Sequence, residues 1–153
     1  MARTSAGLAV YRRTGTGIEV LLVHPGGPFW MKKDDGAWSF PKGEFTEGED
    51  PLTTARRELT EETGCAADGD FIPLGTVKQA GGKIVHLWAV EGDCDVTNIR
   101  SNTFSVEWPP RSGRRQDFPE VDRAGWFGPD EARRKLLEGQ RPFVDRLLDV
   151  AQA

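Results

Sequence analysis

The sequence predicts one domain, residues 1–153, in which helices cover both faces of a mixed β-sheet, and the element pattern taken alone indicates an α+β fold. Three observations support this fold class: strand-like runs precede a central helix, further strand-like runs follow it, and helical segments end the chain. Sheets and helices in this arrangement bury their apolar faces against one another in layers. A chain of 153 residues is long enough to bury a sizeable core as one domain.

The predicted strands come from short apolar and β-branched runs separated by Gly, Pro and Thr turns. Before the helix they cover residues 5–12 and 18–24. After the helix they cover residues 71–78, 83–90, 102–108 and 121–127, with residues 109–119 predicted as a loop. Two further helices are expected, over residues 130–138 and 141–150. Loop 29–36 contains Trp30 and Met31, which either line a pocket or cap the core.

The central helix is predicted over residues 51–63. Asp50 is a good N-cap, Pro51 fits the first helical position, and Gly64 favours the left-handed conformation that ends a helix. At 100° per residue, one stripe of the helix is suited to packing on a sheet. A neighbouring stripe holds Glu58, Glu61 and Glu62, which repel one another at these spacings. Grouped carboxylates are what a hard divalent ion such as Mg²⁺ needs, so this stripe predicts a metal site.

The segment around this helix resembles the signature of the Nudix (MutT-like) hydrolases. The matching positions run from Gly43 to Cys65 at the spacing of that motif, and they are Gly43, Glu49, Arg57, Glu58, Leu59, Glu61, Glu62, Gly64 and Cys65. The resemblance implies an α/β fold, an α/β/α sandwich with a mixed sheet between helices, in which residues 37–42 form a short strand that leads into the motif. It also implies a pyrophosphohydrolase that cleaves a phosphoanhydride bond in a nucleoside diphosphate linked to another moiety, with Mg²⁺ or Mn²⁺ as cofactor.

The resemblance also assigns roles within the motif. Glu58, Glu61 and Glu62, with the backbone carbonyl of Gly43, are the expected metal ligands. Glu49 and Arg57 are expected to form a structural ion pair between loop and helix. For Arg57, a simple helix-surface pair with Glu61 is the alternative.

The candidate catalytic residues are Glu58, Glu62 and Glu120. Glu58 is our first choice for the general base and Glu120 the second, because a late acidic residue often joins the metal site in relatives. The alternative for Glu120 is a surface pair with Arg123.

Substrate-binding candidates lie on both sides of the motif. Lys42 directly precedes Gly43 and is placed to meet a phosphate, although a solvated surface lysine is an equal alternative. Arg111, Arg114 and Arg115 form a basic run in an otherwise acidic protein, and arginine suits bidentate phosphate contacts. The alternative is a solvated charge run.

The substrate is not determined at this level. An NTP or a dinucleoside polyphosphate is expected, while an inositol pyrophosphate or another diphosphate stays open. The tyrosine associated with dinucleoside polyphosphate hydrolases is missing near Lys83, and the proline of ADP-ribose hydrolases is missing near Gly81. A non-catalytic nucleotide-sensing module is the alternative function, and the complete set of motif glutamates favours the enzyme.

Composition limits the partners. A net charge of −4 argues against a nonspecific binder of duplex nucleic acid, and no apolar run is long enough for a membrane span. Cys65 and Cys94 are expected to be reduced thiols of a cytoplasmic protein, outside any zinc site. The oligomeric state, monomer or homodimer, is left open.

Overall fold

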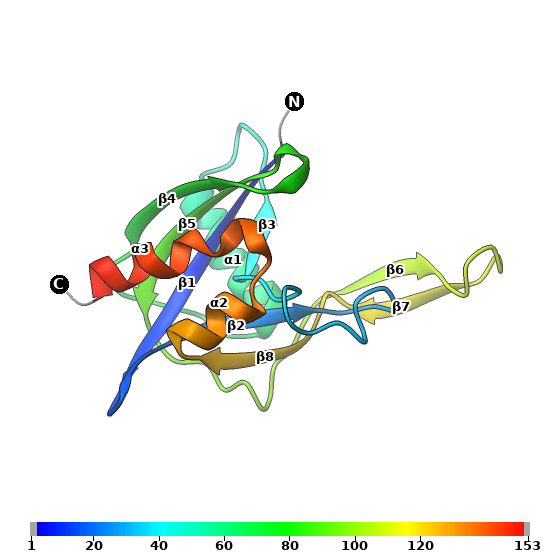
Figure 1. The fold of residues 1–153 in the computed structure, drawn as a ribbon. Helices are drawn as coiled ribbons and strands as arrows, with labels where there is room; N and C mark the ends of the chain where they lie inside the picture. Colours follow the sequence, from blue (N-terminus) through cyan, green and yellow to red (C-terminus); the bar gives the residue numbers. More distant parts are fainter. Residues whose placement is uncertain (1–2, 152–153) are drawn as a thin grey trace.

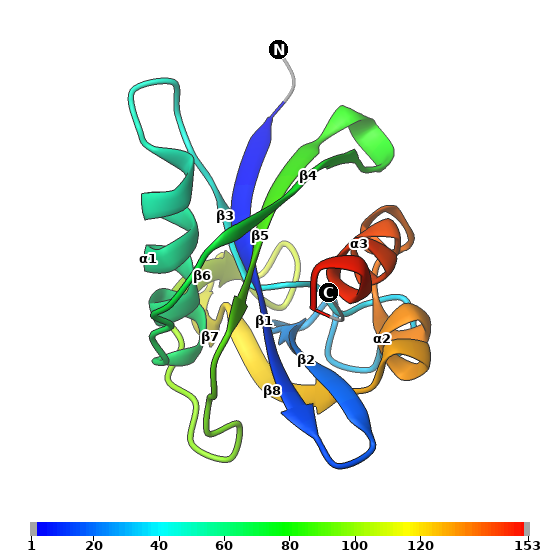
Figure 2. The ribbon, with the colours of Figure 1, turned by 90° about the vertical axis from the view of Figure 1, so that its left-hand side faces the viewer.

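A computed structural model describes residues 3–151 and shows three layers. A mixed β-sheet separates helix α1, Pro51–Thr63, on one face from α2, Pro129–Lys135, and α3, Pro142–Ala151, on the other. Figure 2 shows this arrangement most directly, with α1 and α3 on opposite sides of β1 and β5. The predicted α/β/α sandwich is therefore confirmed.

The main sheet has the strand order β4-β5-β1-β2-β8, with β3 paired to β1. Its strands are β1 Thr4–Thr14, β2 Gly17–Pro25, β3 Lys42–Glu44, β4 Ile72–Lys78, β5 Ile84–Glu91 and β8 Val121–Phe127. The β1–β5 pair is parallel, with Thr4 opposite Ile84 and Tyr11 opposite Glu91, and the other pairs are antiparallel. The parallel pair places β1, which precedes α1 in the chain, beside β5, which follows α1.

A second, two-stranded sheet corrects the sequence prediction. Residues 109–119 were expected to be a loop, but β7, Arg115–Pro119, pairs antiparallel with β6, Thr103–Glu107. Polar residues in β7 hide its strand character, because the apolar ring that it contributes, Phe118, pairs with Phe104 on the neighbouring strand and makes no alternating pattern by itself. Figure 1 shows this β6–β7 hairpin extending away from the sandwich.

Two boundaries also differ from prediction. In the predicted strand 37–42, Trp38 and Ser39 make only isolated bridges, and the regular strand before α1 begins at Lys42. Helix α2 ends at Lys135 rather than near residue 138, and a 3₁₀ turn, Glu138–Gln140, follows it. Within residues 3–151, no helix combines the length and apolarity needed to cross a bilayer.

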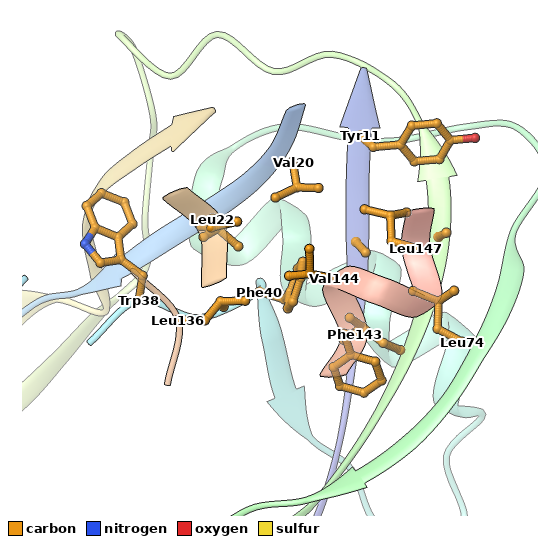
Figure 3. Packing of buried hydrophobic residues seen from close by; sticks show 14 of the residues in the cluster. Tyr11, Val20, Leu22, Trp38, Phe40, Leu74, Leu136, Phe143, Val144 and Leu147 are labelled. Carbon is orange, nitrogen blue, oxygen red and sulfur yellow. The ribbon is translucent and has the colours of Figure 1, made fainter. Parts of the chain in front are cut away.

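Each face of the sheet has its own apolar core. On the α1 face, Ala55 and Leu59 pack against sheet residues such as Leu8. On the opposite face, Phe143 and Leu147 of α3 join a larger cluster, part of which is drawn in Figure 3. Its members are Ala9, Tyr11, Ile18, Val20, Leu22, Ala37, Trp38, Phe40, Leu74, Val85, Leu87, Ala89, Ala132, Leu136, Phe143, Val144, Leu147 and Ala151. Burying both faces fixes α1 on the sheet, and with it the glutamates that α1 carries.

Candidate active site

Helix α1 begins and ends where its capping residues predict. The Asp50 side chain accepts a hydrogen bond from the Thr53 amide at 3.0 Å, and Pro51 occupies the first turn. Gly64 donates its N–H to the Thr60 carbonyl and has a φ of 80°. A side chain at this position would disfavour that left-handed backbone conformation. The capped helix holds its glutamates at a defined height above the sheet.

A disulfide joins the end of this helix to the segment after β5. Cys65 and Cys94 are bonded, with Cα atoms 5.7 Å apart, so the expectation of two reduced thiols is wrong for this structure. The two residues are 29 positions apart and carry no spacing signature. Only the packing of α1 against β5 brings them together.

Three carboxylates converge beside β3. Ligand oxygens of Glu58, Glu62 and Glu120 all lie within 4.8 Å of one another. Glu58 and Glu62 come from α1, while Glu120 lies between β7 and β8. The structure therefore brings the late acidic residue to the helix, and Arg123, its alternative partner, lies 3.7 Å from Asp122 instead.

Glu61 lies beside this cluster rather than in it. Its carboxylate is 3.5 Å from the Arg57 guanidinium, in the helix-surface pair considered above. Arg57 also reaches Glu49 at 3.3 Å, so the expected loop-to-helix ion pair is present as well. Arg57 thus neutralises part of the negative charge next to the cluster.

Glu120 is the exposed member of the cluster, whereas burial makes Glu62 hard to ionise without a cation. Burial raises the pKa of Glu62 to about 8, against an opposing effect of Lys42. Burial first, and Glu61 second, raise the pKa of both Glu58 and Glu120 above the ordinary value, while Arg57 acts in the opposite direction on Glu58. Desolvated carboxylates that face one another are suited to a divalent cation, which would compensate their charge.

The chain next to Gly43 fits closely around the same carboxylates. The Lys42 amide donates to Glu62 Oε1 at 3.3 Å. A Cβ added to Gly43 would overlap the carboxyl group of Glu58, so only glycine leaves room for that side chain. Position 43 is therefore restricted by the site itself and not by a turn.

A hollow of about 190 Å³ opens beside the cluster; we call it the inner hollow. Its lining residues are Val23, Pro25, Trp30, Ala37, Ser39, Lys42, Glu62, Glu120, Val121 and Leu137. Burial lowers the pKa of Lys42, with Glu62 opposing the effect. Lys42 thus has the location expected of a phosphate-binding residue, beside two carboxylates of the cluster.

Several residues that shape the inner hollow carry no sequence signal. Leu137 is one apolar residue in a turn, and its role depends on contact between segments far apart in the chain. Gln140 is buried, and its amide oxygen accepts from the Phe40 amide at 3.0 Å, which supports the wall containing Ser39. Trp30 lines the inner hollow, whereas Met31, its neighbour in the same loop, does not.

The basic run lies elsewhere. Arg111 and Arg114 occupy the connection between β6 and β7, at the end of the hairpin that projects from the sandwich (Figure 1). The Arg115 guanidinium donates to the hydroxyl and the carbonyl of Ser105, both at 3.0 Å. The structure does not bring these arginines to the carboxylate cluster.

The fold and the carboxylate-bearing helix define the class, an α/β/α sandwich of the Nudix type. The NUDIX domain family model matches residues 1–147, and the chain belongs to this family. In structure it is similar to an Ap4A hydrolase of C. elegans, with a TM-score of 0.66, 19% identity and coverage of 99% and 98% of the two chains. It is also similar to the NUDIX domain of Shewanella oneidensis NrtR complexed with ADP ribose, with a TM-score of 0.68, 14% identity and coverage of 99% and 89%. At these identities the likeness shows the fold.

Sequence relatives match parts of the chain. It is 44% identical over 52 residues to the RNA pyrophosphohydrolase of Caulobacter vibrioides, covering 31% of this chain and 30% of that protein. It is 46% identical over 100 residues to Nudix hydrolase 7 of Arabidopsis thaliana, covering 60% and 34%. The matches thus span about a third of the length of these two relatives.

Proposed function

We propose that this protein is a divalent-metal-dependent Nudix pyrophosphohydrolase that cleaves a phosphoanhydride bond in an NTP or a dinucleoside polyphosphate. The observation that carries the proposal is the convergence of Glu58, Glu62 and Glu120 beside a hollow that also contains Lys42. The names of the relatives, an RNA pyrophosphohydrolase and an Ap4A hydrolase, agree with this reaction class.

The donor set fits Mg²⁺ or Mn²⁺. Glu58 and Glu62 would hold the ion together with Glu61 or Glu120 and the Gly43 carbonyl, since hard cations prefer oxygen ligands. A bound ion supplies charge neutralisation for the diphosphate and makes a water molecule more acidic. The raised pKa of Glu62 supports this assignment, because a group that is costly to ionise alone gains most from a nearby cation.

The chain's own residues provide the remaining steps. Lys42 binds a phosphate oxygen and positions the diphosphate in the inner hollow. One carboxylate accepts a proton from the attacking water as its oxygen bonds to phosphorus, and the phosphoanhydride P–O bond breaks to release the second phosphate product. We assign the proton acceptor to Glu58, whose raised pKa brings it nearer to neutral pH, and retain Glu120 as the second candidate.

A substrate screen tests the proposal. NTPs and diadenosine polyphosphates are incubated with Mg²⁺ or Mn²⁺, and released phosphate, pyrophosphate and mononucleotide are measured for the wild type and Glu62→Gln. Glu47→Gln is the matched control, because Glu47 is an exposed glutamate in the loop before α1. Turnover that requires metal and is lost only in Glu62→Gln supports the enzyme. Tight nucleotide binding without turnover by any metal-loaded form would instead establish the sensing module.

A further inference from the structure

A second and larger hollow lies between the loop after β2 and the β6–β7 hairpin. Its volume is about 650 Å³, and we call it the outer groove. Its lining residues are Pro28, Phe29, Met31, Lys32, Lys33, Trp108, Gln116 and Phe118. Figure 1 shows the loop running along the hairpin, and the roles assigned above use none of these residues.

Close contact at two glycines holds the loop after β2 against the β6–β7 hairpin. The Gly26 amide donates to the Glu120 carbonyl at 2.9 Å, and a Cβ at Gly26 would overlap the Pro119 carbonyl. A Cβ at Gly27 would lie 2.7 Å from Phe104 Cζ, and Gly27 has a φ of 95°. The hairpin is therefore held against the loop, and the groove exists before any ligand enters it.

The walls of the groove combine exposed rings with positive charge. Phe29 and Met31 are 59% and 58% exposed, and they are the large hydrophobic side chains that remain exposed within residues 3–151. Phe29 meets Trp108 edge to face, with ring centroids 5.6 Å apart. Neither Lys32 nor Lys33 forms a side-chain ion pair with any residue in the range 3–151. An aromatic ligand that carries negative charge matches both features.

Both walls of the outer groove continue into the inner hollow. On one wall, Trp30 lines the inner hollow while its neighbours Phe29 and Met31 line the groove. On the other wall, Phe118 lines the groove, and Glu120, two residues later, belongs to the carboxylate cluster. Two residues of extended chain span about 7 Å, so the groove begins close to the proposed reaction centre.

We propose that the outer groove binds the second nucleoside of a dinucleoside polyphosphate, with its base against Phe29 and Trp108 and its phosphate chain passing Lys33 toward the cluster. Lys33 lines the groove while its Nζ lies 5.0 Å from the centre of the Trp30 ring, which places a positive charge between the two hollows. The inference rests on the proposed function, because it identifies which phosphoanhydride substrate that site prefers.

The test compares diadenosine tetraphosphate with ATP, which has the same adenosine but lacks the second nucleoside. In Phe29→Ala and in Trp108→Ala, kcat/KM for diadenosine tetraphosphate should fall about tenfold or more, as expected for the loss of base stacking, with little change for ATP. Phe29→Leu, which keeps apolar volume without a ring, should resemble Phe29→Ala. Lys33→Ala should lower kcat/KM for the dinucleotide selectively, whereas Lys78→Ala, at an exposed lysine of β4 outside the groove, should not.

Calorimetry separates failure of this inference from failure of the proposed function. Both nucleotides are titrated with Mg²⁺ into Glu58→Gln, alone and combined with Phe29→Ala. If the wild type hydrolyses both nucleotides and the groove variants leave the ratio of kcat/KM unchanged, the inference is overturned and the function stands. If the wild type hydrolyses neither, a calorimetric preference for the dinucleotide that Phe29→Ala abolishes still supports the groove. In that case, equal affinities for the two nucleotides, or no binding of either, overturn the inference. It is also overturned if Phe29→Ala weakens only the binding of a 5′-triphosphorylated RNA dinucleotide.

Discussion

The carboxylate cluster and the β6–β7 hairpin share the same kind of sequence signal, but the fold places their charges in different surroundings. Each is a run of like charges, glutamates on α1 and arginines over 111–115. The glutamates lie on a helix packed against β1 and β3, and two of them meet Glu120 within 4.8 Å. The arginines lie in the β6–β7 connection and at the start of β7, outside the main sheet, and remain exposed. Like charges indicate a site when packing forces them to converge and removes water from them.

The largest effect is expected when the proposed proton acceptor of the carboxylate cluster is replaced. Glu58→Gln should lower kcat by roughly 10²–10⁴-fold, the range for a lost general base. Additional Mn²⁺ should not restore the rate, because Glu62, the Gly43 carbonyl and Glu61 or Glu120 would still hold the ion while the proton acceptor is missing. Glu120→Gln should show a smaller loss. Metal titrations of kcat at several pH values distinguish the two variants, and recovery of Glu58→Gln with continued inactivity of Glu120→Gln would assign the base to Glu120.

Breaking the disulfide tests what holds α1 in place. Cys65→Ser combined with Cys94→Ser should lower the free energy of unfolding by about 2–4 kcal/mol, because the cross-link closes a loop between residues 29 positions apart. Thermal or urea unfolding of the double variant and of the wild type, each with and without dithiothreitol, gives the measurement. The reductant should destabilise only the wild type. A wild type that reductant leaves unchanged would mean that the bond contributes nothing to stability.

Gly43→Ala tests the close fit of Glu58. The added methyl group would overlap the Glu58 carboxyl group, so we expect kcat to fall roughly 10²-fold, the scale for displacing a reacting group by about 1 Å. The melting temperature should change much less than the rate. Gly48→Ala is the control, since no atom lies within 4 Å of a Cβ added there. Equal activity of the two variants would show that Glu58 can move without consequence.

The raised pKa of Glu62 predicts competition between protons and metal. The metal-free protein holds this proton up to about pH 8, so Mg²⁺ affinity should rise with pH by up to about tenfold per unit below pH 8. The free energy of unfolding of the metal-free protein should instead fall as the pH rises. The unfolded chain releases the proton near its model value of 4.5, so this residue destabilises the folded state increasingly from about pH 4.5 to 8. Calorimetric Mg²⁺ titrations and melting curves at pH 6, 7 and 8 measure both, and in Glu62→Gln the dependence should largely disappear.

The smallest effect is expected at the hairpin. Replacing Arg111, Arg114 and Arg115 with Ala should raise KM by a few-fold, reduce its sensitivity to salt, and leave metal affinity unchanged, because exposed charges attract phosphate weakly and are screened. KM measured at two ionic strengths for wild type and variant provides the comparison. An unchanged KM would identify the arginines as a solvated charge run.

The sequence by itself determined the central helix and the identity of the acidic residues. Asp50, Pro51 and Gly64 act through neighbouring backbone groups, so their signals are local and α1 has the predicted bounds. The spacing of Glu58, Glu61 and Glu62 places them on one helical stripe whatever surrounds the helix. The family resemblance supplied the sandwich, which the family match and the fold confirm.

Only the tertiary structure decided which distant groups meet. Glu120 reaches the cluster, Cys65 bonds to Cys94, and Gly26 contacts Pro119 because separate segments pack on one sheet, and spacing along the chain does not encode those distances. The strand character of β7 is hidden for a related reason, since Arg115, Gln116 and Asp117 are polar and the apolar partner of Phe118 is Phe104 on the other strand. Burial, which raises the pKa of Glu62, is likewise a property of the packed molecule, because the sequence gives the carboxyl group and the fold removes its water.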